Sequence, residues 1–315
     1  MTVDIICAVF DGAQYLPEFL ASLRAQTYAD WRLWLRDDGS SDESPALLRR
    51  EAAQDDRIRL LEHDSPRLGA ARSFDWLLAR TPADAHYVMC ADQDDVWLPR
   101  KIEGTLHAMR RAEAETPGAP VLVHTDLTVV DAVLRPVHPS FWTYAGMDPE
   151  PATLRRFIVR NVTTGATLML NAPLRVLAAD APPEMLFHDW WYACVAASFG
   201  RIVALREPTV LYRQHGGNAV GARNGRLTLD RVPRGVAAGV RNAREFRRGL
   251  RQTAAQARAF LDRFGDRLSE SDREFLKAYS EIPYQRFVRR KLDLLRFRAL
   301  PEHGLVRRLG VLLRG

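Results

Sequence analysis

The sequence predicts a doubly wound α/β sheet followed by a helical, Arg-rich extension. Short apolar or β-branched runs alternate with helical patterns over the first two thirds of the chain. Acidic clusters follow two of those runs, and basic residues gather toward the carboxyl end. We place the boundary near residue 225, where glycines cluster, so that residues 1–225 form the α/β domain and 226–315 the extension.

The first elements follow from hydrophobic periodicity. Val3–Val9 is almost continuously apolar, which is typical of a buried parallel strand. Apolar residues at helical spacing predict a helix over 15–26. The same alternation then predicts strands over 31–35, 58–62 and 86–90, and helices over 45–53, 70–79 and from 101 onward.

Beyond residue 100 the pattern becomes mixed. It predicts a helix over 188–198, a loop-rich insert over 135–151, and strands over 121–124, 128–130, 166–170, 202–205 and 209–212. From residue 227 the pattern is helical, with breaks near Gly265, Pro283 and Pro301. A short basic amphipathic helix is expected over 304–314.

Composition narrows the class of protein. With 47% hydrophobic and 27% charged residues among 315, the chain is globular, which excludes collagen-like and disordered classes. Its three cysteines, at 7, 90 and 194, are too few and too widely spaced for a disulfide framework or a zinc site. No stretch approaches the ~18 apolar residues of a membrane span, and no basic leader is evident, so we expect a cytoplasmic protein.

The net charge of +6 conceals an asymmetry. From residue 221 onward there are 23 Lys and Arg against 10 Asp and Glu, a net of +13, which leaves −7 for the rest. A basic region suits phosphate-rich partners, either lipid headgroups or nucleic acid. The extension is therefore either a helical bundle packed on the enzyme or a peripheral membrane surface. We do not expect nucleic acid as a partner, because zinc-finger and RNA-recognition signatures are lacking and the α/β part is acidic.

Two acidic clusters follow predicted strands. Asp92, Asp94 and Asp95 are hard oxygen ligands that suit Mg²⁺ or Mn²⁺, although a solvated turn is the alternative. Asp37 and Asp38 fit either a helix cap or a contact with a nucleobase or ribose.

Several ordered motifs together resemble family 2 glycosyltransferases of the GT-A fold, which has a Rossmann-like mixed sheet. The motifs are VFDG at 9–12, DDGSSD at 37–42, DQDDVW at 92–97 and HDWW at 188–191. The longer strings CADQDDVWLPRKIE, NVTTGATLML and YRQHGGNAVG are most similar to bacterial rhamnosyltransferase-type members. The resemblance covers roughly residues 3 to 221.

The resemblance implies a reaction: inverting transfer of one sugar from a nucleoside diphosphate to a hydroxyl of a glycan or lipid-linked acceptor. The donor implied is dTDP-rhamnose, with a UDP-hexose as the alternative. Such enzymes serve cell-surface polysaccharide synthesis. The signature of processive synthases, Gln-x-x-Arg-Trp, is absent.

The resemblance also assigns residues. Asp189 matches the catalytic base, and Asp38 the contact to the base of the nucleotide. Asp92 and Asp94 match the ligands of ribose and metal, with Asp95 assisting.

Other residues have secondary roles or open alternatives. Arg72 matches a basic position near the nucleotide, although an exposed helical Arg is the alternative. His215 either reaches the diphosphate or metal, or packs in a loop. Trp190, Trp191 and Gly165 are candidate contacts to sugar or acceptor, and aromatic flanks of Asp189 would raise its basicity by excluding water.

Overall fold

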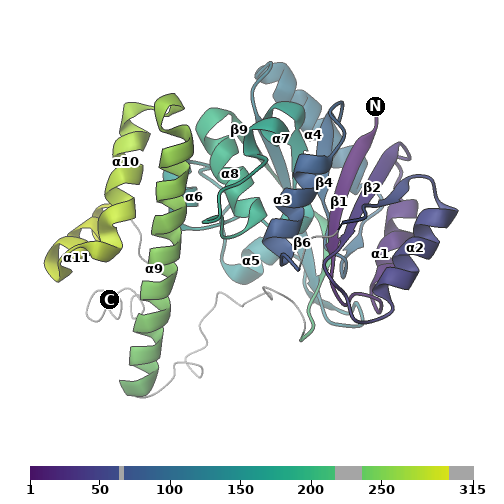
Figure 1. Cartoon of the computed structure of the whole chain (residues 1–315), viewed down its shortest axis with the longest axis horizontal. Helices are drawn as coiled ribbons and strands as arrows, with labels where there is room; N and C mark the ends of the chain where they lie inside the picture. The colour runs from purple at the N-terminus through teal and green to yellow at the C-terminus, as the bar shows by residue number, and fades with distance from the viewer. Residues whose placement is uncertain (64–66, 217–235, 298–315) are drawn as a thin grey trace.

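The structure is a computed structural model that describes residues 1–63, 67–216 and 236–297. A central sheet is covered by helices on both faces, and the carboxyl-terminal helices stand along one side of it (Figure 1). Up to residue 130 the elements are β1 (Val3–Val9), α1 (Leu16–Arg24), β2 (Trp31–Asp37), α2 (Ser44–Gln54), β3 (Ile58–Leu60), α3 (Ala70–Arg80), β4 (Tyr87–Cys90), β5 (Val96–Trp97), α4 (Lys101–Glu115) and β6 (Val121–Val130). The later elements are β7 (Pro136–His138), α5 (Phe141–Ala145), α6 (Leu154–Val159), the 3₁₀ turn η1 (Gly165–Thr167), β8 (Met169–Asn171), α7 (Ala172–Ala178), α8 (His188–Phe199), β9 (Arg201–Arg213), α9 (Val236–Phe264), η3 (Gly265–Arg267), α10 (Glu270–Glu281), η4 (Ile282–Tyr284) and α11 (Phe287–Arg296).

Within the described residues, nine strands form one mixed sheet in the order β3-β2-β1-β4-β8-β6-β9-β5, with β7 paired to β6. The first four strands are parallel, as the βα alternation predicts. β8 runs antiparallel to both of its neighbours, and β5 runs antiparallel to β9. The predicted GT-A fold, with its mixed sheet, is confirmed. Because β1, β2 and β4 are parallel, their carboxyl ends meet at one edge, and both acidic clusters lie there.

Strand alternation builds two cores, one on each face of the sheet. Along β1, Ile5 and Cys7 face a core with α1 and α4, whereas Ile6 faces a second core with α3 and α8. This division follows from the period of two along a strand. It also explains the continuous apolar run of 3–9, since both faces of β1 are buried.

The carboxyl-terminal helices share the second core. The rings of Phe260 on α9 and Trp191 on α8 lie 5.2 Å apart in an edge arrangement. Leu186 N–H, just before α8, donates to the side-chain oxygen of Gln256 at 2.9 Å. α9 thus packs directly on the helix that begins with His188 and Asp189.

Some predicted elements need correction. The two predicted strands at 121–124 and 128–130 are one strand, β6, and those at 202–205 and 209–212 are one strand, β9. Polar residues interrupt the apolar runs near the places where the register between β6 and β9 shifts, at Thr125, Asp126 and Thr128, while the pairing continues on both sides. The predicted strand at 166–170 is the turn η1 followed by β8. The loop-rich insert at 135–151 contains β7 and α5.

Several predictions fall outside the described residues: the boundary near 225, the helix start at 227, the break at Pro301 and the helix over 304–314. The predicted breaks at Gly265 and Pro283 coincide with η3 and η4. The three cysteines are free and buried, as expected. Among the residues that the structure describes, no helix combines the length and apolar character needed to cross a bilayer.

Candidate active site

The acidic loop after β4 is fastened to the loop after β1 by Gln93. Its side chain accepts from Phe10 N–H and donates to Phe10 C=O, both at 2.9 Å. A side chain at Gly12 would collide with it, because an added Cβ would lie 2.3 Å from the Gln93 oxygen. A larger residue at position 12 would thus displace the Gln93 side chain that joins the VFDG and DQDD motifs.

The carboxylates of the acidic loop differ in their surroundings. Burial, together with Asp94 and Asp189, raises the pKa of Asp92 to about 7. Asp95 is completely buried, and its Oδ1 accepts from Arg213 N–H at 3.0 Å. Burial and the neighbouring acids raise its pKa well above the usual range. Asp95 thus faces the protein interior, whereas Asp94 stays partly exposed beside His215.

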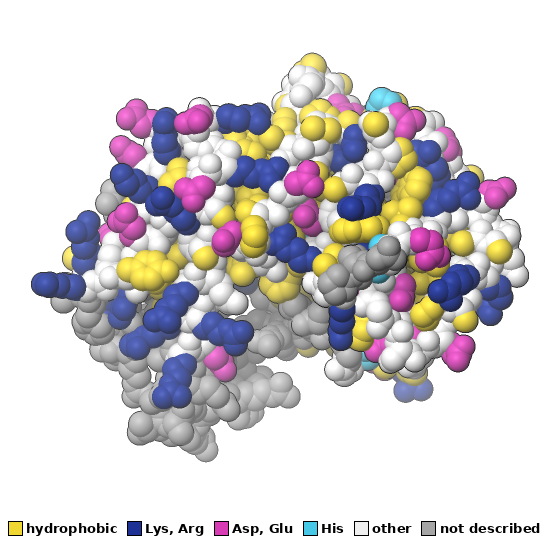
Figure 2. All heavy atoms as spheres, in the orientation of Figure 1, with side chains coloured by type: hydrophobic (Ala, Val, Ile, Leu, Met, Phe, Trp, Pro, Cys, Tyr) yellow, Lys and Arg dark blue, Asp and Glu magenta, His cyan; other side chains and the backbone are white. Residues whose placement is uncertain are grey.

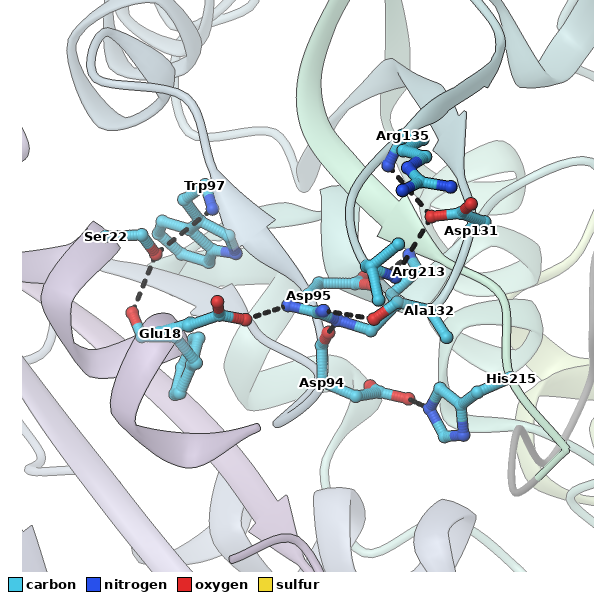
Figure 3. A network of polar contacts seen from close by, with 12 residues as sticks. Glu18, Ser22, Asp94, Asp95, Trp97, Asp131, Ala132, Arg135, Arg213 and His215 are labelled. Carbon is cyan, nitrogen blue, oxygen red and sulfur yellow. Dashed lines mark hydrogen bonds and ion pairs between the residues drawn. The ribbon is translucent and has the colours of Figure 1, made fainter. Parts of the chain in front are cut away.

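His215 lies against Asp94, as Figure 3 shows. Its Nε2 is 2.8 Å from Asp94 Oδ2, and its ring stacks on Tyr15 with 4.5 Å between centroids. The residues predicted for the metal and the diphosphate are thus brought together from two segments separated by 121 residues. Tyr15, which supports the His215 ring, was not singled out from the sequence.

Arg213 is the centre of the network around this loop (Figure 3). Its Nε donates to Asp94 C=O and its Nη1 to Ala132 C=O, each at 2.8 Å, and its Nη2 pairs with Glu18. Its side chain is only 3% exposed, so its bonds to the two main-chain oxygens are protected from water, whereas the Glu18 side chain is 54% exposed. Arg213 therefore joins the end of β9 to the acidic loop and to α1, a role that the sequence did not reveal beyond the YRQHGGN string.

Asp189 lies in the first turn of α8 and is 8% exposed. Burial raises the pKa of its carboxyl group to about 6, while hydrogen bonds from Asn161 and from Trp190 N–H pull in the opposite direction. The Asn161 amide donates to Oδ2 at 2.9 Å, and Trp190 N–H donates to Oδ1 at 2.7 Å. A carboxylate with a pKa near neutrality is suited to accept a proton. The negative charge of Asp189 is also one of the causes that raise the pKa of Asp92 in the acidic loop.

His188, the neighbour of Asp189, is neutral. Burial lowers its pKa to about 3, and its ring stacks on Phe74 at 3.9 Å. A Cβ on Gly165 would approach His188 Nε2 to 2.8 Å, so glycine at 165 allows the close contact. Gly165 is itself buried beneath this ring rather than open to solvent.

The two tryptophans of α8 differ. Trp191 is fully buried, and its indole N–H donates to Ala178 C=O at 3.1 Å. It leaves no exposed ring face for a sugar. Trp190 is partly exposed, and its indole N–H donates to Phe157 C=O. Of this pair, we retain only Trp190 as a candidate sugar contact.

Asp38 and Arg72 are engaged with the protein itself. Asp38 is 3% exposed and accepts from Leu68 N–H at 2.8 Å and Gly69 N–H at 2.7 Å. Burial opposes its ionisation, but these donors outweigh burial and hold the pKa of Asp38 below its usual value. Arg72 donates to the main-chain oxygens of Ala181 and Pro182. In this structure Asp38 orders the start of α3, and Arg72 fastens the segment that leads to α8.

A hollow of about 180 Å³ opens at the carboxyl ends of β2 and β3. Asp37, next to Asp38, lines it, and within the described residues its buried Oδ1 has no hydrogen-bond partner. Arg67 also lines it, with its guanidinium 3.4 Å from the centroid of the Phe10 ring. A guanidinium and an unpaired acceptor are suitable surroundings for a nucleoside.

The comparisons with known proteins decide the family. The sequence model described as "Glycosyl transferase family 2" matches residues 4–167, which is more than half of the chain. The chain belongs to glycosyl transferase family 2. The match includes β1, both acidic clusters and Gly165, and it ends before α8.

Curated family members are similar over parts of their length. EpsE of Bacillus subtilis is 28% identical over 140 residues, 44% of this chain and 49% of EpsE. The dTDP-rhamnosyl transferase RfbG of Shigella flexneri is 23% identical over 230 residues, 68% of this chain and 73% of RfbG. WfgD of Escherichia coli, a UDP-Glc:alpha-D-GlcNAc-diphosphoundecaprenol beta-1,3-glucosyltransferase, is 30% identical over 107 residues, 34% of this chain and 40% of WfgD. The match with EpsE thus spans about half the length of that relative.

Solved structures with the same fold extend further along the chain. Staphylococcus aureus TarS 1–349 in complex with UDP-GlcNAc has a TM-score of 0.56 at 14% identity, covering 99% of this chain and 78% of that one. The mannosyltransferase PcManGT of Pyrobaculum calidifontis, in complex with GDP-Man and Mn²⁺, has a TM-score of 0.50 at 19% identity, covering 94% and 73%. At these identities the likeness establishes the fold alone.

Proposed function

We propose that this protein is an inverting, metal-dependent glycosyltransferase that moves one sugar from a nucleoside diphosphate to an acceptor hydroxyl. The observation that carries the proposal is the buried Asp189, whose pKa is raised to about 6, close to the acidic loop of Asp92 and Asp94. Direct displacement at an anomeric carbon requires a base for the acceptor hydroxyl and a site that stabilises the departing diphosphate.

In this reaction Asp189 takes the proton of the acceptor hydroxyl as its oxygen attacks the anomeric carbon from the face opposite the diphosphate. The bond from that carbon to the diphosphate oxygen breaks, and the configuration inverts. Its low exposure keeps competing water away from the carboxylate. The proton then remains on Asp189 until the product leaves.

The donor set fits a divalent cation shared with the substrate. Among the described residues no group of three or more His, Cys, Asp or Glu side chains is arranged to hold a metal alone. Asp94 and His215 nevertheless converge to 2.8 Å, with Asp92 two residues away. Carboxylates suit Mg²⁺ or Mn²⁺, and such ions complete their shell with phosphate oxygens and water. We propose that Asp94, His215 and Asp92 hold this ion, which when bound neutralises charge on the departing diphosphate. Asp95, which is buried and bonded to Arg213 N–H, would hold the acidic loop in position.

For the nucleotide, we propose that the base enters the hollow beside Asp37 and Arg67. Asp38 would act there by ordering the adjacent chain at Leu68 and Gly69. Arg72 would act on nucleotide binding indirectly, because its guanidinium holds the main chain at residues 181–182.

The proposed donor is dTDP-rhamnose, which the similarity to RfbG over most of both chains supports. A UDP-hexose is the second candidate, supported by the 30% identity with WfgD over its matched segment. Incubation of the protein with dTDP-rhamnose, UDP-glucose, UDP-GlcNAc and GDP-mannose, each with Mn²⁺ or Mg²⁺, distinguishes them by release of nucleoside diphosphate. An NMR spectrum of the product glycoside reports whether the configuration has inverted. Retention of configuration would overturn the proposed mechanism.

The proposed acceptor is a glycan or lipid-linked glycan, reached at the inner face of the cytoplasmic membrane. The support is a surface on α11 and η4 where Tyr284, Leu292 and Leu295 are 78%, 61% and 50% exposed. Arg286 and Arg289 are exposed between them. Lys and Arg side chains are spread over the part of the molecule where α9, α10 and α11 lie (Figure 2). Apolar side chains with basic neighbours complement an anionic lipid surface.

A further inference from the structure

The loop between α6 and η1 contacts the carboxylate of Asp189 through Asn161. The amide nitrogen of Asn161 lies 2.9 Å from Asp189 Oδ2. Trp190 N–H satisfies the other oxygen at 2.7 Å. The Asn161 amide thus contacts one carboxylate oxygen of Asp189, and a main-chain N–H contacts the other.

The orientation of the Asn161 amide is determined by Thr163. The Asn161 side-chain oxygen accepts from Thr163 N–H at 3.0 Å and from the Thr163 hydroxyl at 2.7 Å. A flipped amide would place its NH₂ against a main-chain N–H and its oxygen against the carboxylate. Because Thr163 excludes that flip, Asn161 presents a donor to Asp189 at all times.

We propose that Asn161, itself held by Thr163, is a positioning residue that keeps the Asp189 carboxylate ionised and in one orientation. The inference rests on the proposed role of Asp189 as the base. Thr163 and Asp189 are 5% and 8% exposed, so water cannot readily replace the amide. Burial favours the neutral acid at Asp189, and the Asn161 hydrogen bond is the largest of the opposing contributions to its pKa.

The test compares pH profiles of kcat/KM for four proteins: wild type, Asn161→Ala, Thr163→Val and Thr163→Ser. In Asn161→Ala we expect the acid limb to move up by about 1 to 2 pH units, since a hydrogen bond to a charged group is lost. Well above that limb kcat should return to within a few-fold of wild type, and KM for the donor should stay constant. Thr163→Val removes the hydroxyl bond to the amide but keeps the main-chain N–H bond, so it should move the limb by a smaller amount. Thr163→Ser keeps the hydroxyl and should leave it unchanged.

A uniform loss of rate at every pH in folded Asn161→Ala, with the limb unmoved, would show a merely structural role and overturn the proposal. If Asn161→Ala does not fold, Asn161→Leu, which is close in size to Asn and lacks the donor, takes its place, and an unmoved limb in that folded variant decides against the proposal in the same way. The Asp189→Asn variant separates the two hypotheses. If Asp189→Asn keeps its activity, the assignment of Asp189 as the base fails. If Asp189→Asn is inactive but the acid limb does not move in the Asn161 variant, only the positioning role is rejected.

Discussion

A carboxylate in water is a weak base, and Asp189 shows how local structure alters that property. Removal of water raises its pKa to about 6, and hydrogen bonds from the Asn161 amide and from main-chain N–H groups prevent a larger rise. The result is a group that is mostly ionised at neutral pH and yet binds a proton far better than a solvated carboxylate does.

This pKa predicts the pH dependence of the reaction. If Asp189 is the base, as proposed, it must be ionised to act, and because its pKa is raised, activity should be present above pH 6 and lost as pH falls through that value. We expect kcat/KM to decline about tenfold per pH unit below about pH 6. Initial rates between pH 4.5 and 8.5 measure this, with circular dichroism to confirm folding at each pH. A flat profile down to pH 5 would contradict the assignment.

Replacement of the base isolates its chemical role. Asp189→Asn keeps the side-chain shape and removes proton acceptance, so turnover should fall about 10²–10⁴-fold while donor affinity changes little. Single-turnover kinetics and calorimetry with the nucleotide give the two quantities. Asp180→Asn, at an exposed position before α8, is the matched control and should remain active. Turnover within a few-fold of wild type in Asp189→Asn would place the base elsewhere.

Metal and nucleotide should bind together through Asp94. Because Asp94 and His215 are the converging donors, Asp94→Ala should weaken Mn²⁺-dependent binding of UDP or dTDP by at least roughly tenfold. Calorimetry with and without Mn²⁺ measures the difference, and Asp84→Ala, at an exposed site, serves as control. Unchanged metal-dependent affinity in the folded variant would remove Asp94 from the proposed metal ligands.

For single residues, the sequence predicted which residues belong to the site better than it predicted the contacts that they make. Asp92, Asp94 and His215 were identified from motifs, and the structure brings Asp94 and His215 together. Asn161 and Arg213 lay inside recognised strings, but their roles depend on distances across 28 and 119 residues that no local pattern contains.

Among the elements, α8 and α9 form the principal pair outside the sheet. Phe260 is completely buried against Trp191, and Gln256 binds the main chain just before α8. α9 therefore supports the helix that carries Asp189, although it follows the family match by some 70 residues.

Truncation of Phe260 should expose this dependence. Phe260→Ala leaves a cavity in a packed core and should lower the free energy of unfolding by about 3–5 kcal/mol. Urea denaturation followed by tryptophan fluorescence measures it. Arg258→Ala lies on the exposed side of the same helix, and its loss should cost under about 1 kcal/mol. Equal stability of the two variants would mean that α9 does not anchor α8.

The elements show where local patterns succeed and where they fail. The strands at 3–9 and 31–35, the second of which extends to Asp37 in the structure, and the helix from residue 101 were predicted because apolar spacing alone determines them. β6 and β9 were each predicted as two strands, since polar residues at their register shifts interrupt the apolar runs while the main-chain pairing continues. The antiparallel insertion of β8 between β4 and β6 depends on pairing across the sheet, which periodicity does not report.

For the molecule as a whole, the excess of basic residues toward the carboxyl end predicts peripheral binding to anionic membranes through α11. Arg289→Glu on α11 should weaken binding to anionic vesicles roughly thirtyfold, because each basic residue near the lipid contributes about 1 kcal/mol and reversal counts twice. Leu292→Ser with Leu295→Ser should weaken binding through loss of apolar contact. Arg111→Glu on α4, a reversal at another exposed site, is the control.

Sedimentation with vesicles of phosphatidylglycerol or phosphatidylcholine, at low and high salt, provides the measurement. Binding should require the anionic lipid and should fall at high salt, while transfer to a soluble acceptor stays intact in every variant. Binding that is equal and negligible in all conditions would leave α11 as a helix that only packs on the enzyme.

The hydrogen bonds by which Arg213 holds the acidic loop also have a consequence for synthesis of the chain on the ribosome. The acidic loop leaves the ribosome long before Arg213, which follows Asp94 by 119 residues. At about 5–20 residues per second, this interval lasts roughly 6 to 24 s. During that time the nascent chain contains the DQDD segment but lacks both Arg213, whose guanidinium binds that segment, and His215, whose imidazole contacts Asp94. The unfinished enzyme should therefore be unable to capture nucleotide sugar, and donor binding begins only when translation has passed the end of the last long strand.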